Sequence, residues 1–273
     1  MPVPAHPVIV LMTDFGITDS YVGQMKGVIL SIAPEARIID LTHAITPQNI
    51  AHGAFILTKS ADFFPEGSIF ISVVDPGVGT SRNAIAVRTE RALFLAPDNG
   101  LLTSILQTRS VTEAVTITDS RYLLPVRSST FHGRDVFSPA AAHLASGVPI
   151  QNLGKSIDPA TCTRIPMPEC HTLDNGKTWE GSIIYTDHFG NLVTSLDARL
   201  LDRSKKWHVH AGKHRHPVSR TYGDAADQKP LAYTGSFGTI EIAVRNGNAR
   251  ETLGLKDGDP VRAESTPVAP EKP

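Results

Sequence analysis

Apolar positions in the N-terminal part of the chain follow two alternating periods. Short apolar runs of strand length occupy residues 8–14, 36–43, 67–75, 84–90, 92–98 and 113–118. Segments with apolar side chains at helical spacing occupy residues 19–33, 49–64, 101–108 and 135–145. The run at 67–75 is apolar at nearly every position, which is typical of a parallel strand covered on both faces. We therefore predict an N-terminal α/β layered domain over residues 1–160, with a mostly parallel central sheet.

The pattern changes after this domain. Residues 161–178 are rich in Pro, Asn, Gly and Thr and have no apolar period, so they are predicted to form a linker. Residues 179–265 contain only short strand-like runs separated by turn signals, with no apolar run of helical length. This pattern predicts a smaller C-terminal antiparallel β-barrel-like domain. Residues 266–273 are predicted to be a disordered tail.

Composition narrows the class of protein. The 273 residues are 41% hydrophobic and carry a formal net charge of -1 at pH 7. This balance is typical of globular proteins and lacks the basic surface of a nucleic-acid binder. No cationic segment precedes the short apolar run near the N-terminus, so neither a signal peptide nor a membrane span is predicted. The two cysteines, Cys162 and Cys170, could form a disulfide, but without an export signal we expect reduced thiols and a cytoplasmic protein.

Carboxylates follow two of the predicted strands, at the sheet edge where open α/β sheets bind ligands. Asp14 ends the first strand and Asp75 ends the third. Each acid alone has an equally good interpretation as a helix cap or turn residue. Asp98, in a Pro-Asp-Asn-Gly turn, is expected to be structural. The combination of strand-terminal acids with His132, in a loop just before a predicted helix, favours a ligand site.

The C-terminal part has candidates of its own. Asp187 and Asn191 flank a tight turn, and Ser236 and Phe237 lie between two glycines. All four could instead be ordinary hairpin residues. A further group of histidines raises a weaker possibility of zinc binding, since no other ligand motif accompanies it. These histidines are His208, His210, His214 and His216.

Five motifs in this order resemble one known family. They are TDFGITDSYVGQMKG, VVDPGVGTSR, APDNGLL, FHGRDVFSPAAAHLA and DHFGNLVTS. Together they resemble the S-adenosyl-L-methionine (SAM) hydroxide adenosyltransferases, the adenosine-forming SAM hydrolases, which are relatives of fluorinases and chlorinases. The resemblance runs from about residue 8 to about residue 262. It implies an N-terminal α/β domain, a C-terminal β-barrel-like domain and a homotrimer with SAM bound between subunits.

The resemblance also implies roles for individual residues. The catalytic set of the family corresponds to Asp75, Arg82 and His132. Positions that resemble the family's substrate contacts are Asp14 for the ribose hydroxyls, Asp19 and Asp187 for the methionine ammonium, Asn191 for the adenine, Ser236 for the methionine carboxylate, and Phe237 and Asn246. No metal and no cofactor are implied, because SAM is the substrate.

The chain departs from the halogenating relatives in three respects. Those enzymes carry Tyr-Ser where this chain has His132 and Gly133, so a serine that helps hold halide is absent. Phe237 stands where they carry an arginine, and the spacing from Asp187 to Asn191 is one residue shorter than theirs. The first departure favours water over fluoride or chloride as the nucleophile.

The reaction implied is in-line attack of water on the ribose 5′ carbon of SAM, which releases adenosine and methionine. An acid, a guanidinium and an imidazole suit this step because free water is a poor nucleophile and a positioned base accelerates proton removal by roughly 10²–10⁴-fold. Two alternatives remain. One is a metal-dependent nucleotide phosphohydrolase that uses Asp14, Asp75, Asn99 and His132 as ligands. The other is a SAM- or adenosine-binding protein with negligible turnover.

Overall fold

The computed structural model describes residues 7–202 and 204–266. The chain divides into two compact units, Met1–Met167 and Pro168–Pro273. The division falls within the segment predicted to be a linker. That segment is not free of regular structure, because the short strand β7 (His171–Thr172) pairs with residues 179–180 of the next strand. Thr266 ends the last strand, whereas the tail was predicted to begin there; residues 267–273 lie outside the described residues.

The first unit contains a six-stranded sheet in the order β2-β1-β3-β5-β4-β6. Its strands are β1 (Val8–Thr13), β2 (Arg37–Thr42), β3 (Ser68–Val73), β4 (Ala84–Thr89), β5 (Ala92–Pro97) and β6 (Val111–Thr116). The four strands β2, β1, β3 and β5 are parallel, and β4 runs antiparallel to both of its neighbours. The predicted mostly parallel sheet is therefore confirmed.

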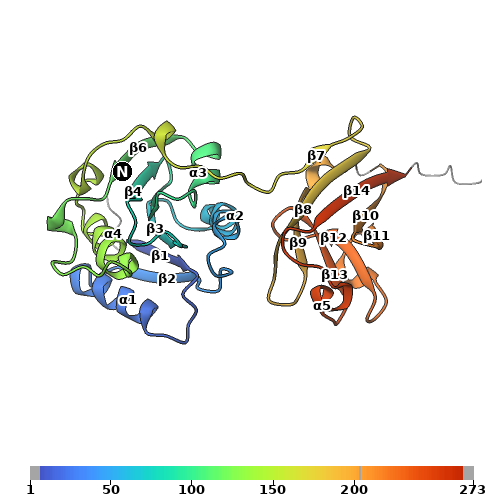
Figure 1. The fold of residues 1–273 in the computed structure, drawn as a ribbon, viewed down its shortest axis with the longest axis horizontal. Coiled ribbons are helices and arrows are strands. Elements are labelled where there is room, and N and C mark those ends of the chain that lie inside the picture. The colour runs from blue at the N-terminus through green and yellow to red at the C-terminus, as the bar shows by residue number, and fades with distance from the viewer. Residues whose placement is uncertain (1–6, 203, 267–273) are drawn as a thin grey trace, which may run out of the picture. The chain divides into compact units, whose positions relative to one another are not determined.

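Helices cover both faces of this sheet (Figure 1). They are α1 (Tyr21–Ile32), α2 (Ile50–Ser60), α3 (Thr103–Thr108) and α4 (Ser138–Ala145). Because side chains alternate along a strand, Ile9 and Leu11 of β1 pack with α1 and α4, whereas Val10 and Met12 pack with α2 and α3. Short helical turns fill the connections: η1 (Ala61–Phe63), η2 (Ser120–Tyr122), η3 (Gly133–Phe137), η4 (Ile150–Leu153) and η5 (Pro159–Thr161).

The strand order contains a switch point between β1 and β3. From β1 the chain crosses to β2 on one side, and it then returns to β3 on the other side of β1. The connections that leave β1 and β3 therefore diverge at the carboxyl ends of these two strands, which is the position where open α/β sheets bind ligands. Asp14 follows β1 directly, and Asp75 lies two residues beyond the end of β3.

The second unit is a closed β-barrel. Its strands are β8 (Thr178–Thr186), β9 (Leu192–Asp197), β10 (Lys206–Ala211), β11 (His214–Ser219), β12 (Pro230–Thr234), β13 (Thr239–Val244) and β14 (Pro260–Thr266). They follow the order β14-β10-β11-β12-β13-β9-β8, and pairing of β14 with β8 closes the ring. All pairs are antiparallel except β11 with β12, so the predicted antiparallel β-barrel-like domain is confirmed.

Apolar side chains that alternate along the barrel strands fill its interior, among them Trp207, Val209, Ile240 and Ile242. The remaining elements are η6 (Ala198–Leu200), η7 (Tyr222–Asp224) and the short helix α5 (Ala249–Leu253). In the part of the chain that the structure describes, no helix combines the length and the apolar character needed to cross a membrane.

Candidate active site

The chain brings Asp75, Arg82 and His132 together at the end of β3. After β3, two successive turns form, with the amide of Val78 bonding to the carbonyl of Asp75 and the amide of Thr80 bonding to the carbonyl of Gly77. Gly79 has φ +81°, and a Cβ atom there would lie 2.9 Å from the carbonyl oxygen of Ser129. Glycine therefore lets this loop lie against the segment that leads into His132.

The three side chains are joined by direct bonds. Arg82 Nε lies 3.1 Å from Oδ1 and 2.9 Å from Oδ2 of Asp75. Arg82 Nη2 also donates to Oδ2 of Asp75, and it lies 2.8 Å from Nδ1 of His132. The side chains of Arg82 and Asp75 are 9% and 4% exposed. One guanidinium thus holds both the acid and the imidazole in fixed positions, largely shielded from bulk water.

The bond to Arg82 fixes the tautomer of His132. A guanidinium only donates hydrogen bonds, so Nδ1 of His132 must accept. The proton of the neutral ring then resides on Nε2, which is free to act as a donor. Burial lowers the pKa of His132, and the positive charge of Arg82 lowers it further, while Asp75 and Asp135 act in the opposite direction. The net direction keeps the ring neutral near pH 7.

An ion pair between the partly exposed Arg134 and the buried Asp135 braces the segment around His132. Arg134 Nε lies 2.6 Å from Oδ1 of Asp135, and Asp135 is completely buried. Asp135 Oδ2 accepts from the amide of Ser128, and the Arg134 guanidinium lies 4.9 Å from the centre of the Phe131 ring. Arg134 and Asp135 also lie in the first half of the wide π-helical turn η3. The loop before His132 is therefore tied to the helix that follows it.

Gly133 sits in a crowded place beside His132. A Cβ atom at this position would lie 3.2 Å from Sδ of Met25, 3.2 Å from Cε2 of Phe15 and 3.3 Å from Cε2 of Phe131. These distances are shorter than ordinary van der Waals contacts. A serine at this position would need its neighbours to shift.

The two other acids of the first unit lie in the connection between β1 and α1. Asp14 is partly buried, and its Oδ2 accepts from the amide of Gln48 at 2.8 Å. Asp19 is exposed. Both acids stand at the switch-point edge of the sheet, on the connection that leaves β1.

Asp187 and Asn191 bond to each other across the β8–β9 turn. Asp187 Oδ1 accepts from the amides of Phe189 and Asn191, at 2.9 and 2.8 Å. Asp187 Oδ2 accepts from Nδ2 of Asn191 at 3.0 Å. Both residues thus serve the hairpin itself, as the turn interpretation of the sequence anticipated.

The remaining predicted contacts lie before and after β13. Ser236 is exposed and Phe237 partly buried in the turn between β12 and β13. Asn246 lies in the turn that follows β13, where its φ is +53° and its Nδ2 donates to Oδ1 of Asp227 at 2.7 Å. The six residues of β13 therefore separate Ser236 from Asn246, a span of roughly 20 Å at strand geometry.

Comparison with known proteins identifies the family. Residues 9–154 match the model of the SAM hydroxide adenosyltransferase N-terminal domain, and residues 181–262 match that of the C-terminal domain. The chain belongs to the SAM hydroxide adenosyltransferase family. The family expected from the five sequence motifs is thereby confirmed.

The relatives that this chain resembles include both hydrolases and fluorinases. It is 41% identical to the (R)-S-adenosyl-L-methionine hydrolase of Thermus thermophilus, over 92% of this chain and 97% of the relative. It is 30% identical to the fluorinase of Actinopolyspora mzabensis, over 94% of this chain and 97% of the relative. Among solved structures, a conserved uncharacterized protein from Thermotoga maritima has a TM-score of 0.86 at 34% identity, covering 93% of this chain and 99% of that one.

Asp98 and Asn99 have structural partners. Asp98 Oδ1 accepts from the amide of Thr163 at 2.7 Å, and Asn99 Nδ2 donates to the carbonyl of Val74 at 2.9 Å. Across residues 7–202 and 204–266, no three His, Cys, Asp or Glu side chains form a group that could hold a metal ion. The four histidines of β10 and β11 therefore form no such group. Cys162 and Cys170 are free thiols.

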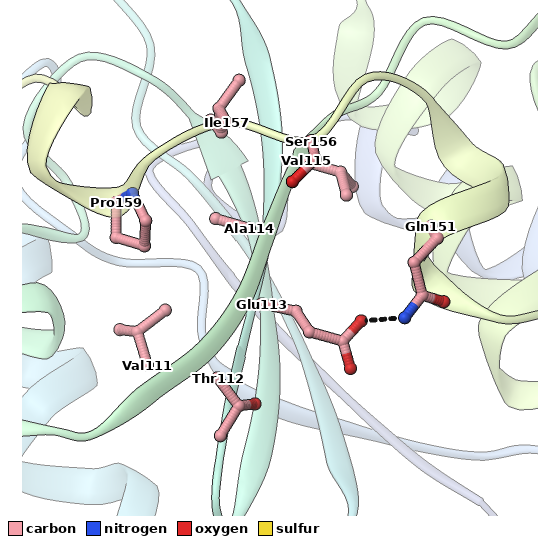
Figure 2. A pocket seen from close by; sticks show the side chains of 9 residues that line it. All are labelled: Val111, Thr112, Glu113, Ala114, Val115, Gln151, Ser156, Ile157 and Pro159. Atoms are coloured by element: carbon pink, nitrogen blue, oxygen red, sulfur yellow. Dashed lines mark hydrogen bonds between the residues drawn. The ribbon is translucent and has the colours of Figure 1, made fainter.

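A small surface pocket of about 230 Å³ lies along the edge strand β6 (Figure 2). Gln151 bonds to Glu113 beside it, and the chain at Ser156 and Ile157 crosses the outer side of the strand. A larger cavity of about 950 Å³ in the barrel unit is lined by Trp207, Val218 and Ile240 among others. None of the residues predicted to be catalytic or to bind substrate lines either of them, whereas His208, one of the four histidines considered for zinc, lines the larger cavity.

The sequence interpretation missed one set of residues near Asp14. Thr13, the last residue of β1, bonds through Oγ1 to Nδ1 of His43 at 2.8 Å. The signal available in the sequence was His43, which follows β2 directly and therefore lies at the same edge of the sheet as Asp14. Periodicity does not distinguish such a histidine from an ordinary turn residue.

Proposed function

We propose that this protein hydrolyses SAM to adenosine and L-methionine. The observation that carries the proposal is the convergence of Asp75, Arg82 and His132 beside the switch point. The chain that shows this convergence belongs to the SAM hydroxide adenosyltransferase family and is 41% identical to a SAM hydrolase. In this reaction water attacks the 5′ carbon in line with the carbon–sulfur bond. The new carbon–oxygen bond forms as the carbon–sulfur bond breaks, and methionine leaves with the bonding electron pair.

We assign the proton of the attacking water to Asp75. The only lone pair of the neutral His132 ring is engaged by Arg82, so the ring cannot accept a proton without losing that bond. A carboxylate has lone pairs beyond those used by Arg82. Nε2–H of His132 and the Arg82 guanidinium then stabilise the hydroxide character that develops on the water oxygen. This division makes Asp75 the base and His132 a donor.

The substrate contacts follow the family pattern as part of the same proposal. Asp14 binds the ribose hydroxyls, Asp19 and Asp187 meet the methionine ammonium, and Asn191 contacts the adenine. Ser236 faces the methionine carboxylate, and Phe237 and Asn246 complete the binding residues. Fixing the substrate at both ends supports in-line attack, because orientation supplies a large part of the rate enhancement.

Gly133 supports water rather than halide as the nucleophile. The position has no hydroxyl to hold a halide ion, and the contacts with Met25, Phe15 and Phe131 leave little space for one. The chain also has higher identity to the hydrolase from Thermus thermophilus than to the fluorinase from Actinopolyspora mzabensis.

We propose further that the protein is a cytoplasmic homotrimer with active sites at subunit interfaces, and that it uses no cofactor. The sulfonium is already a good leaving group, so the reaction as written needs no metal. Ile17 and Tyr21, just after Asp14, are 86% and 46% exposed, and apolar surface of this kind is suited to cover by a neighbouring subunit. Analytical ultracentrifugation tests the trimer.

The test of function is product analysis of the purified protein incubated with SAM. Adenosine and methionine are expected in equal amounts, with and without EDTA, and at a sharply lower rate for Asp75→Asn. Tight SAM binding with intact SAM recovered after long incubation would instead establish a binding protein. Phosphate release from nucleotides that EDTA abolishes would establish the phosphohydrolase.

A further inference from the structure

A chain of polar contacts runs from the protein surface to the residue before Asp14. Lys26 Nζ lies 2.6 Å from Oδ2 of Asp40. Nε2 of His43 lies 3.1 Å from Oδ1 of Asp40, within ion-pair range although not aligned as a hydrogen bond. Nδ1 of His43 lies 2.8 Å from Oγ1 of Thr13. Thr13 is completely buried, and His43 is 5% exposed.

The direction of each hydrogen bond in this series of contacts follows from the acceptor at one end, Asp40. Asp40 is an acceptor, since Lys26 and His43 together outweigh its partial burial and hold its pKa below the ordinary value. A ring nitrogen facing a carboxylate is favoured as N–H, so the proton of neutral His43 belongs on Nε2. Nδ1 then accepts from the hydroxyl of Thr13. The hydroxyl oxygen in turn accepts from the amide of Phe15 at 3.2 Å.

The same segment holds Asp14 from its other side. The amide of Gly16 donates to the carbonyl of His43 at 2.8 Å. The amide of Gln48, five residues after His43, donates to Oδ2 of Asp14 at 2.8 Å. Gln48 has φ +63°, a left-handed conformation that is unfavourable for a residue other than glycine. The residues before and after Asp14, and its carboxylate, are therefore all tied to the segment that begins at His43.

We infer that His43 is a positioning residue for Asp14. Through Thr13 and Gly16, it sets the backbone from which the Asp14 carboxylate projects toward the ribose hydroxyls of the substrate. The inference rests on the proposed function, because it takes the ribose as the partner of Asp14. His43 itself does not touch the reacting atoms, and its effect is specific for the ribose end of the ligand.

The experiment compares two ligands that differ only in the ribose hydroxyls. Calorimetry measures dissociation constants for adenosine and for 2′,3′-dideoxyadenosine with the wild-type protein and variants. The wild type is expected to prefer adenosine. In His43→Ala this preference is expected to fall roughly tenfold, as for the loss of one well-placed hydrogen bond. His43→Asn keeps an acceptor near the position of Nδ1 and is expected to retain most of the preference.

Two further variants separate positioning from general damage. Thr13→Val removes the hydroxyl at nearly constant shape and is expected to reduce the preference as His43→Ala does, which covers the case in which His43→Ala does not fold. His143→Ala, on α4 beside Tyr122, is the matched control and is expected to keep the wild-type preference.

The inference is overturned if His43→Ala and Thr13→Val keep the wild-type preference, or if they weaken both ligands equally. It also fails if the wild type does not distinguish the two ligands. Failure of the proposed function is seen separately, as the absence of adenosine when the wild type is incubated with SAM.

Discussion

Arg82 donates through one nitrogen, Nη2, to both Asp75 and His132, with Nη2 lying 2.8 Å from Nδ1 of His132. This single group connects the loop after β3 with the loop before α4. Because it donates to the ring, it determines which nitrogen of neutral His132 carries the proton. The relationship leads directly to the first two predictions.

Arg82→Lys is expected to lower the turnover number by roughly 10²-fold or more, with a smaller change in KM. A lysine carries a single point charge and cannot bond to Asp75 twice and to His132 at the same time. Steady-state kinetics with SAM measure the effect. Arg88→Lys is the matched control, since Arg88 pairs with Glu113 on β6 and is expected to retain wild-type turnover. Turnover unchanged in Arg82→Lys would contradict the proposed site.

The activity is expected to fall on the acid side at a pH below the ordinary histidine value of 6.5. His132 must be neutral for Nδ1 to accept from Arg82, and burial followed by the charge of Arg82 lowers its pKa. The ring therefore stays neutral, and the enzyme active, through pH 6.5, and activity is lost only as the pH falls through the lowered value. A profile of kcat/KM against pH measures this. An acid midpoint above 6.5 would exclude this role for His132.

Gly133→Ser is expected to destabilise the fold by about 1 kcal/mol and to slow hydrolysis without creating halide transfer. The added side chain meets Met25, Phe15 and Phe131 at 3.2–3.3 Å before it can offer a hydroxyl to an ion. Thermal unfolding and chromatography for 5′-halogenated adenosine in chloride or fluoride check both parts. Gly23→Ser on α1, where a Cβ atom meets nothing within 4 Å, is the control for the substitution itself. Appearance of a halogenated product would show that space is not limiting.

The free energy of unfolding is expected to decrease by up to about 3 kcal/mol between pH 6.5 and pH 4 through His52 alone. Burial lowers the pKa of His52 to about 4, and this residue is 6% exposed. Below pH 6.5 the unfolded chain binds a proton that the folded chain does not, so stability is lost as the pH falls and the loss is complete near pH 4.

Denaturant unfolding at several pH values measures this loss as the difference between wild type and His52→Asn. The difference is needed because burial also lowers the pKa of His143, His208 and His216. The Asn variant keeps an acceptor for the amide of Thr46 and should lose less stability in acid. His171→Asn, whose side chain is 68% exposed, should keep the wild-type dependence. Equal slopes for all three proteins would rule out His52 as a source of acid sensitivity.

Periodicity alone predicted the two kinds of architecture in this chain. Residues 8–14 were predicted to form a strand, and in that strand Ile9 and Leu11 face one helical layer whereas Val10 and Met12 face the other. The short runs after residue 178 likewise predicted strands of a barrel. The apolar pattern suffices to assign such strands and helices, because each assignment depends only on residues that are close together in the sequence. Pairing between β7 and β8 does not, so the short strand at 171–172 was not anticipated.

The sequence by itself determined the family, the strand-terminal position of Asp14 and Asp75, and the residue types available for chemistry. Only the tertiary structure decided that Arg82 reaches His132, fifty positions away, and which nitrogen of the ring it occupies. It also decided that Thr13 and His43 bond to each other beside Asp14, and that Asp187 and Asn191 bond to each other within their own turn. The physical reason is that a hydrogen bond depends on distance and direction in space, to within a few tenths of an ångström. A linear pattern of residues fixes which groups exist, whereas the packing of the sheet, loops and helices fixes which of them meet.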